Sequence, residues 1–173
     1  SFTFSTGSTY TISVDQYVSG SSGTRYHCTS PSQSVSSSGT ITFSYHTEYY
    51  LTVNSAYDTP GGSGWYDSGQ NAYATLQTGT VSGGAGIQYV FTGWSGDASG
   101  SALTSNAILM NSPKTATANW KTQFYLTVKT APLGLDEPTG EDWYDEGTHA
   151  SISVDTPTGG DEVSMRYRFN NWT

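Results

Sequence analysis

The sequence has little cysteine, few basic residues and no long apolar run. Its single cysteine, Cys28, rules out a disulfide framework within the chain. Only six of the 173 residues are Lys or Arg, and the net charge is −8. The basic clusters that hold nucleic-acid phosphates or anionic membrane surfaces are therefore missing. No stretch approaches the roughly 20 apolar residues that span a bilayer. We expect no nucleic-acid partner and no membrane insertion in this chain.

Charge of either sign is scarce, because 12% of the residues are charged against about 25% in an average soluble domain. Ser, Thr, Gly and Tyr make up the difference. Thr and Tyr favour strands, while Gly and Ser favour the turns between them. The composition therefore predicts an all-β chain. Few lysines together with many Ser and Thr are typical of secreted or cell-surface proteins, so we expect an extracellular location.

The chain repeats itself with a period of about 75 residues, which indicates a modular array. Tyr50-Leu51-Thr52-Val53 recurs at 125–128, and Trp65-Tyr66-Asp67 recurs as Trp143-Tyr144-Asp145. A third, partial copy lies near the N-terminus: Val18-Ser19-Gly20 matches 81–83, and 24–29 takes the place of 87–92. We expect an incomplete repeat over 1–48, a complete one over 49–123 and an incomplete one over 124–173. This register predicts a piece of a longer array, or a subunit whose ends complete its neighbours.

Alternation with a period of two predicts short strands in the complete repeat. Leu51 and Val53 point one way and Thr52 the other. The expected strands cover about 49–55, 71–77, 87–94, 106–110 and 115–121, and Asn111 to Lys114 is expected to form a tight hairpin between the last two. The predicted fold is all-β, with tandem small antiparallel modules that are sandwich-like or Ig-like. A β-grasp-like arrangement is the alternative.

Several segments resemble the internalin-type B-repeat-like family of bacterial and archaeal cell-surface modules, with an archaeal character. They are Tyr49–Val53, Trp65–Gly69, Tyr89–Gly100 and Ile108–Ala118. The Gly-Trp-Ser-Gly-Asp string at 93–97 and the Met-Asn-x-x-Lys-Thr pattern at 110–115 are the specific part. The first copy departs from it, since Ser30-Pro31 replaces Gly93-Trp94. The resemblance implies tandem β-rich modules on surface-layer, adhesin or filament proteins, without catalytic residues.

The histidines and the cysteine occupy positions that other residues fill in the other copies. His27 aligns with Val90, His46 with Lys121, and His149 with Asn71. Because the repeat does not require histidine there, we expect exposed, interchangeable side chains and no metal site. Cys28 aligns with Phe91, so we expect a small buried apolar residue rather than a nucleophile.

The acidic loop of the last repeat is the best candidate for a calcium site, because hard cations take several oxygen ligands from a flexible loop. The candidate ligands are Asp136, Glu137 and Asp145. The complete repeat offers only Asp58 and Asp67 in the same region. We therefore expect a solvated acidic loop and no resident cofactor. Asp97 is expected to shape a turn.

The aromatic pairs Trp65-Tyr66 and Trp143-Tyr144 stand before a turn glycine, where exposed rings could stack on sugars. The preferred interpretation is that each Trp closes the end of a module or the contact between modules. Trp94, Trp120 and Trp172 are expected in the core, and Gly69 and Gly147 in conformations that other residues avoid. Asn171-Trp172-Thr173 is a sequon and a candidate glycosylation site.

Nothing in the sequence singles out a nucleophile with its base or a pair of catalytic carboxylates, so we expect no enzyme. The expected function is a structural repeat region of an extracellular cell-surface protein: a surface-layer, stalk or filament subunit, assembled by strand complementation between neighbours. Its partners would be neighbouring copies of the same repeat or protein. The alternatives are an adhesin or carbohydrate-binding module that contacts surface glycans, and a non-catalytic accessory region of a large secreted enzyme.

Overall fold

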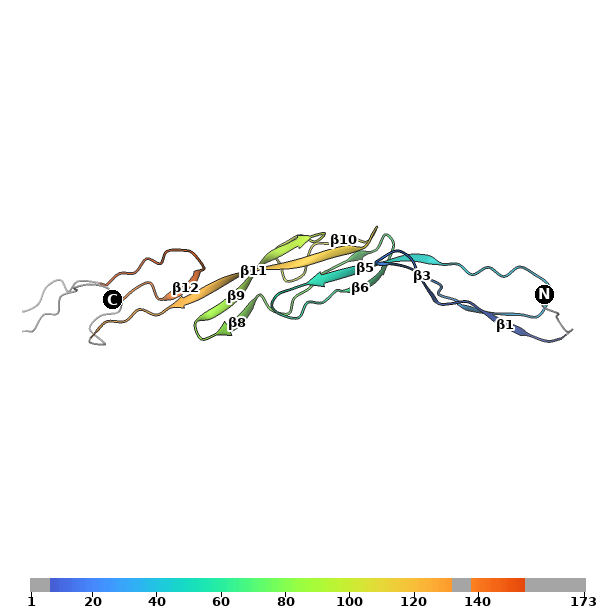
Figure 1. The fold of residues 1–173 in the computed structure, drawn as a ribbon, viewed down its shortest axis with the longest axis horizontal. Coiled ribbons are helices and arrows are strands. Elements are labelled where there is room, and N and C mark those ends of the chain that lie inside the picture. Colours follow the sequence, from blue (N-terminus) through green and yellow to red (C-terminus); the bar gives the residue numbers. More distant parts are fainter. Residues whose placement is uncertain (1–6, 132–137, 155–173) are drawn as a thin grey trace, which may run out of the picture. The chain divides into compact units, whose positions relative to one another are not determined.

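The computed structural model describes residues 7–131 and 138–154, and over these ranges every regular element is a β-strand (Figure 1). The all-β prediction is confirmed. No helix among the described residues is long and apolar enough to cross a membrane. The strands are β1 Tyr10–Ser13, β2 Tyr17–Ser19, β3 Thr24–His27, β4 Ser32–Val35, β5 His46–Asn54, β6 Gly64–Asp67, β7 Asn71–Ala72, β8 Thr80–Gly84, β9 Ile87–Gly96, β10 Ile108–Leu109, β11 Lys114–Leu126 and β12 Asp142–Asp145.

The chain divides into two compact units. The first comprises Ser1–Gly79 and Phe91–Asn119, and the second comprises Thr80–Val90 and Trp120–Thr173. Strands β9 and β11 each have residues in both units.

In the first unit the main sheet has the order β2-β3-β5-β11-β9, and β6 pairs with β5 away from this path. The pairs β2–β3, β3–β5 and β5–β6 are antiparallel, whereas β5 and β11 run parallel, with Leu51 opposite Lys114. The modules were expected to be antiparallel throughout. A parallel pair needs a long crossover between its strands, and residues 55–113, which include β6 to β10, supply it.

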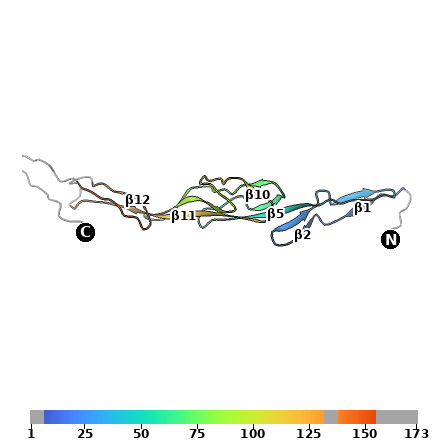
Figure 2. The same ribbon diagram turned by 90° about the horizontal axis from the view of Figure 1, so that it is seen from above.

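The core of the first unit lies between the main sheet and the small β7–β10 ribbon, which Figure 2 shows with β10 to one side of β5. Alternation sets which side chains enter it: Leu51 and Val53 are buried, and Thr52 between them is exposed. The sandwich-like arrangement agrees with the prediction. The ribbon and its flanks add Ala72, Ala74, Leu76, Ile108 and Met110, and β9 and β11 add Trp94, Ala116 and Ala118.

The expected hairpin at 111–114 is wrong. β10 pairs with β7, with Ile108 opposite Ala72, while β11 pairs with β5. The chain therefore passes from the ribbon to the main sheet between residues 109 and 114. A local hydrogen bond explains this path, since the Met110 N–H donates to the Gln70 carbonyl at 2.8 Å and holds the residue after β10 against the ribbon. Strands β6 and β8 were not expected, and β7 covers only the start of the strand expected at 71–77.

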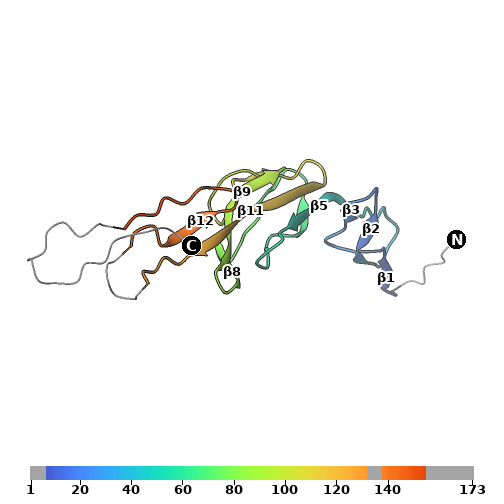
Figure 3. The ribbon, with the colours of Figure 1, turned by 60° about the vertical axis from the view of Figure 1, so that its left-hand side comes forward.

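The second unit contains β8, the first part of β9, the second part of β11, and β12 (Figure 3). β8 and β9 form an antiparallel hairpin with Val81 opposite Tyr89 and an irregularity between Ser82 and Gly84. β12 lies antiparallel on β11, with Tyr125 opposite Trp143. Of the sites expected from the sequence, Asp136, Glu137 and Asn171 lie outside the described residues, as does Trp172.

Candidate functional site

The strand register gathers five polar side chains from different parts of the chain, and we refer to them as the first cross-strand site. They are Arg25 and His27 on β3, His46 and Glu48 on β5, and Asp67 at the end of β6. Pairing places Arg25 opposite Glu48 and His27 opposite His46. Glu48 is in turn opposite Asp67. Directly opposed residues and those two positions apart share one face of a sheet, so the five converge on one face.

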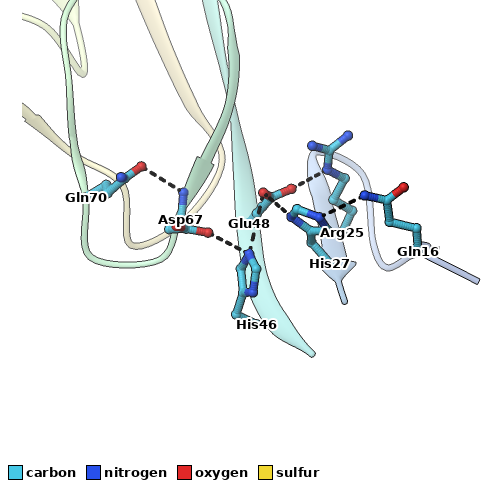
Figure 4. Close-up of polar contacts among 7 residues, drawn as sticks. All are labelled: Gln16, Arg25, His27, His46, Glu48, Asp67 and Gln70. Atoms are coloured by element: carbon cyan, nitrogen blue, oxygen red, sulfur yellow. Dashed lines mark hydrogen bonds and ion pairs between the residues drawn. The ribbon is translucent and has the colours of Figure 1, made fainter. Parts of the chain in front are cut away.

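Glu48 is the centre of this site (Figure 4). Its Oε2 atom is paired with Nε of Arg25, and its Oε1 atom lies 3.1 Å from Nδ1 of His27. Nε2 of His46 lies 3.7 Å from the same Oε1 atom and 2.8 Å from Oδ1 of Asp67. The amide of Gln16 contacts the other ring nitrogen of His27, Nε2, at 3.4 Å. The Glu48 side chain is only 10% exposed, so its charge depends on these partners.

Burial raises the pKa of Glu48, but hydrogen bonds from Arg25 and His27 and their positive charge act in the opposite direction. The balance leaves the pKa of Glu48 below its ordinary value. The side chain is therefore an ionised carboxylate at neutral pH.

Aromatic rings enclose the cationic side of the site. The Arg25 guanidinium lies 4.1 Å from the ring centroid of Tyr17 and 4.6 Å from that of Trp65, within cation–π distance. Tyr17 also stacks on His27 at 4.6 Å, and Tyr50 meets Trp65 edge-on at 5.1 Å. Trp65 of the complete repeat thus contacts a side chain of the segment expected to belong to the preceding repeat.

The second unit contains an equivalent second cross-strand site with different chemistry. It consists of Gln88 on β9, Lys121 and Gln123 on β11, and Asp145 on β12. The Gln88 amide donates to Oε1 of Gln123 at 2.8 Å, and the Gln123 amide donates to Oδ1 of Asp145 at 2.7 Å. Lys121 Nζ lies 2.8 Å from Oδ1 of Asp145. The hydrogen bond from Lys121 is the largest cause that lowers the pKa of Asp145.

The backbone frame of the two sites is the same. Tyr66 donates to the Gly62 carbonyl at 2.8 Å, and Tyr144 donates to the Gly140 carbonyl at 2.9 Å. The Trp143 ring meets Tyr125 edge-on at 5.2 Å, as Trp65 meets Tyr50. The polar side chains around this frame differ. Position for position, Arg25 is replaced by Gln88, His27 by Val90, His46 by Lys121 and Glu48 by Gln123, while the aspartate is kept.

The calcium candidate Asp145 is therefore occupied by cross-strand partners, because Lys121 and Gln123 engage both of its oxygens. An ammonium group already balances its charge. The other acidic residues expected beside it, Asp136 and Glu137, lie outside the described residues.

The structure brings together two of the three histidines that the sequence treated as unrelated. His149 is exposed, as expected. His27 and His46 are not free surface residues: their ring centroids lie 4.8 Å apart and their side chains are 18% and 37% exposed. The signal for this cluster in the sequence is in the repeat alignment, because the residues around Glu48 are all replaced together in the other copy. A comparison of one position at a time does not show it.

Other residues singled out by the sequence take the expected structural places. Cys28 is 1% exposed and lies in the core. Asp97 accepts from the Thr115 backbone N–H at 2.8 Å and fixes the turn after β9. Gly69 and Gly147 have φ angles of 89° and 80°, in the left-handed region that favours glycine.

Comparisons of the chain with family models, with curated proteins and with solved structures found no match.

Proposed function

We propose that this chain is a structural repeat region of an extracellular cell-surface protein, serving as a stalk, surface-layer or filament element. The observation that supports it most is strand sharing at the repeat boundary. On β5, residues from His46 to Tyr49 pair with β3, in the segment expected to be the first repeat. Residues from Leu51 to Asn54 pair with the start of β11, in the segment expected to be the complete repeat. One uninterrupted strand thus serves both expected repeats.

A shared strand joins repeats differently from a linker. A flexible linker extends under small forces because it holds no hydrogen bonds. Here the boundary segment itself is hydrogen-bonded to neighbours on both sides, since β6 also pairs with β5 over 48–51. β11 repeats the arrangement, with 114–117 on β5 and 123–126 on β12. Such an array resists extension at its joints, which is what a stalk or filament requires.

The adhesin alternative depends on exposed aromatic rings, and the described contacts use them internally. The Trp65 ring contacts Arg25 and Tyr50, and the hydroxyl groups of Tyr66 and Tyr144 donate hydrogen bonds to backbone carbonyls. A ring already covered by a guanidinium has less surface left for a sugar. We therefore rank the structural function above glycan binding.

Single-molecule force spectroscopy tests the structural proposal. The chain is held between two long unstructured handles and pulled. We expect discrete unfolding events for the described segments and no compliant extension at the boundary around residue 48. Extension at forces typical of an unstructured linker would contradict the proposal. A glycan array read by tryptophan fluorescence tests the alternative, and specific binding that is lost in Trp65→Ala or Trp143→Ala would favour the adhesin.

Cellular location and assembly are tested separately. Antibodies against the chain should label intact cells of its source without permeabilisation. Electron microscopy at high protein concentration should show end-to-end assemblies if open strand edges are completed by neighbouring copies. Labelling only after permeabilisation would overturn the extracellular assignment.

A further inference from the structure

We propose that His27, His46 and Glu48 form a binding site for a divalent transition-metal ion of the zinc type. This proposal is independent of the structural function above. The three side chains are the one group of three or more His, Cys, Asp or Glu residues in the described part of the chain whose potential ligand atoms all lie within 4.8 Å of one another. Two imidazoles and a carboxylate are a typical donor set for Zn²⁺.

Two of the three donor spacings are close to those around an ion of this size, and the third lies within 4.8 Å. In a tetrahedral zinc site with bonds of about 2.0–2.1 Å, neighbouring ligand atoms are about 3.3–3.4 Å apart. Here Oε1 of Glu48 lies 3.1 Å from Nδ1 of His27 and 3.7 Å from Nε2 of His46. Oδ1 of Asp67 lies 2.8 Å from the same His46 nitrogen, so an ion bound at this nitrogen takes the place of the proton in that contact.

The surroundings hold the ligands in place. Arg25 engages the other oxygen of Glu48, Oε2, and so leaves Oε1 directed at the histidines. Gln16 contacts Nε2 of His27. If Nδ1 binds the metal, Nε2 carries the proton and donates to the amide oxygen of Gln16, whose oxygen and nitrogen can exchange places by rotation. Support of the second ring nitrogen in this way is the usual arrangement for a ligating histidine.

Charge gives an independent reason to expect a cation. In the second cross-strand site the Lys121 ammonium balances the carboxylate of Asp145. In the first site His46 takes the place of that lysine, and its Nε2 atom lies between two carboxylates, 3.7 Å from Oε1 of Glu48 and 2.8 Å from Oδ1 of Asp67. A divalent ion bound by His27, His46 and Glu48 supplies positive charge where the second site has its ammonium group.

Isothermal titration calorimetry of tag-free protein with Zn²⁺ tests the proposal, and Co²⁺ absorption reports the coordination geometry. We expect one ion per chain and a tetrahedral Co²⁺ spectrum. His27→Val and His46→Lys install the residues of the second site, so both should fold. Each should weaken binding by about 100-fold or more, because loss of a ligand exceeds the 10–100-fold effect of losing its support. His149→Ala is the matched control and should bind as the wild type does.

The reciprocal transplant keeps the test decisive even where a loss variant fails to fold. Val90→His, Lys121→His and Gln123→Glu, made together, rebuild the donor set beside Asp145. We expect this variant to bind a second ion. Wild-type binding that persists in His27→Val/His46→Lys, or the absence of Zn²⁺ binding by folded wild-type protein, would overturn the proposal.

Discussion

The pairing of Arg25 with Glu48 can be tested against the chain's own alternative, because the second cross-strand site has glutamine at both equivalent positions. The perturbation is a double-mutant cycle of Arg25→Gln and Glu48→Gln. The double variant recreates the amide pair seen between Gln88 and Gln123 at 2.8 Å. A cycle separates the pairwise interaction from the separate effects of each substitution.

The magnitudes follow from burial and partners. Glu48→Gln removes one charge from a pair whose side chains are 24% and 10% exposed, and loses a charge-assisted hydrogen bond of about 2 kcal/mol. Arg25→Gln leaves the Glu48 carboxylate without its guanidinium and removes two cation–π contacts, for a loss of about 3 kcal/mol. The double variant should lose only about 2 kcal/mol, because a neutral amide pair replaces the ion pair. The coupling energy is then about −3 kcal/mol.

Urea denaturation followed by tryptophan fluorescence measures each free energy of unfolding, since Trp65 lies against Arg25. Hydrogen exchange of the β5 backbone amides provides a local measurement. The matched control is the cycle of Gln88→Ala and Gln123→Ala, for which we expect a coupling energy of about 1 kcal/mol in magnitude. If the two cycles give equal coupling, or if the Arg25–Glu48 coupling is below about 0.5 kcal/mol, the pair does not hold the first site together as reasoned.

Three further outcomes are expected. A Cβ atom on Gly62, at φ 97°, would lie 2.1 Å from the Tyr73 carbonyl oxygen, whereas one on Gly69, at φ 89°, would meet nothing within 4 Å. In thermal denaturation Gly62→Ala should therefore destabilise the folded chain by about 2 kcal/mol or more, and Gly69→Ala by about 1 kcal/mol. The hydrogen bond from the Thr115 N–H, opposed by burial and assisted by Lys114, holds the pKa of Asp97 below its ordinary value. The contribution of Asp97 to folding stability is therefore full above about pH 4 and is lost as the pH falls through the folded-state pKa. Asp97→Asn should lose less stability than the wild type on acidification, and an equal loss would refute this. Cys28, at 1% exposure, should react with a thiol reagent only on unfolding, and Cys28→Ser should destabilise by about 1–3 kcal/mol.

The repeat register could be predicted from the sequence because it depends on side chains that the backbone geometry demands. Tyr66 and Tyr144 make the same hydrogen bond, and Gly62 and Gly140 share a φ of 97°. Alternation likewise placed Leu51 and Val53 in the core. These features are local in sequence or repeat within it, so one copy is evidence for the other.

Pairings between distant strands could not be predicted in the same way. A period of two indicates a strand but not its partner or direction, so the parallel alignment of β5 with β11 left no mark on either segment. The hairpin expected at Asn111 failed for this reason, since the turn residues were compatible with a crossing between layers as well. The cluster around Glu48 depends on the same information, because His27 meets His46 only through the β3–β5 register.

The two cross-strand sites show why the residues of such a cluster change together. Glutamine at position 48 alone would leave the half-buried guanidinium of Arg25 without its paired carboxylate, which is costly. The second site has glutamine at both positions of that pair, so the complete replacement leaves no such charge. The repeat frame therefore admits alternative charge sets without a change of fold. The metal proposal therefore predicts that neighbouring joints of one array differ in their response to metal while sharing the same backbone frame.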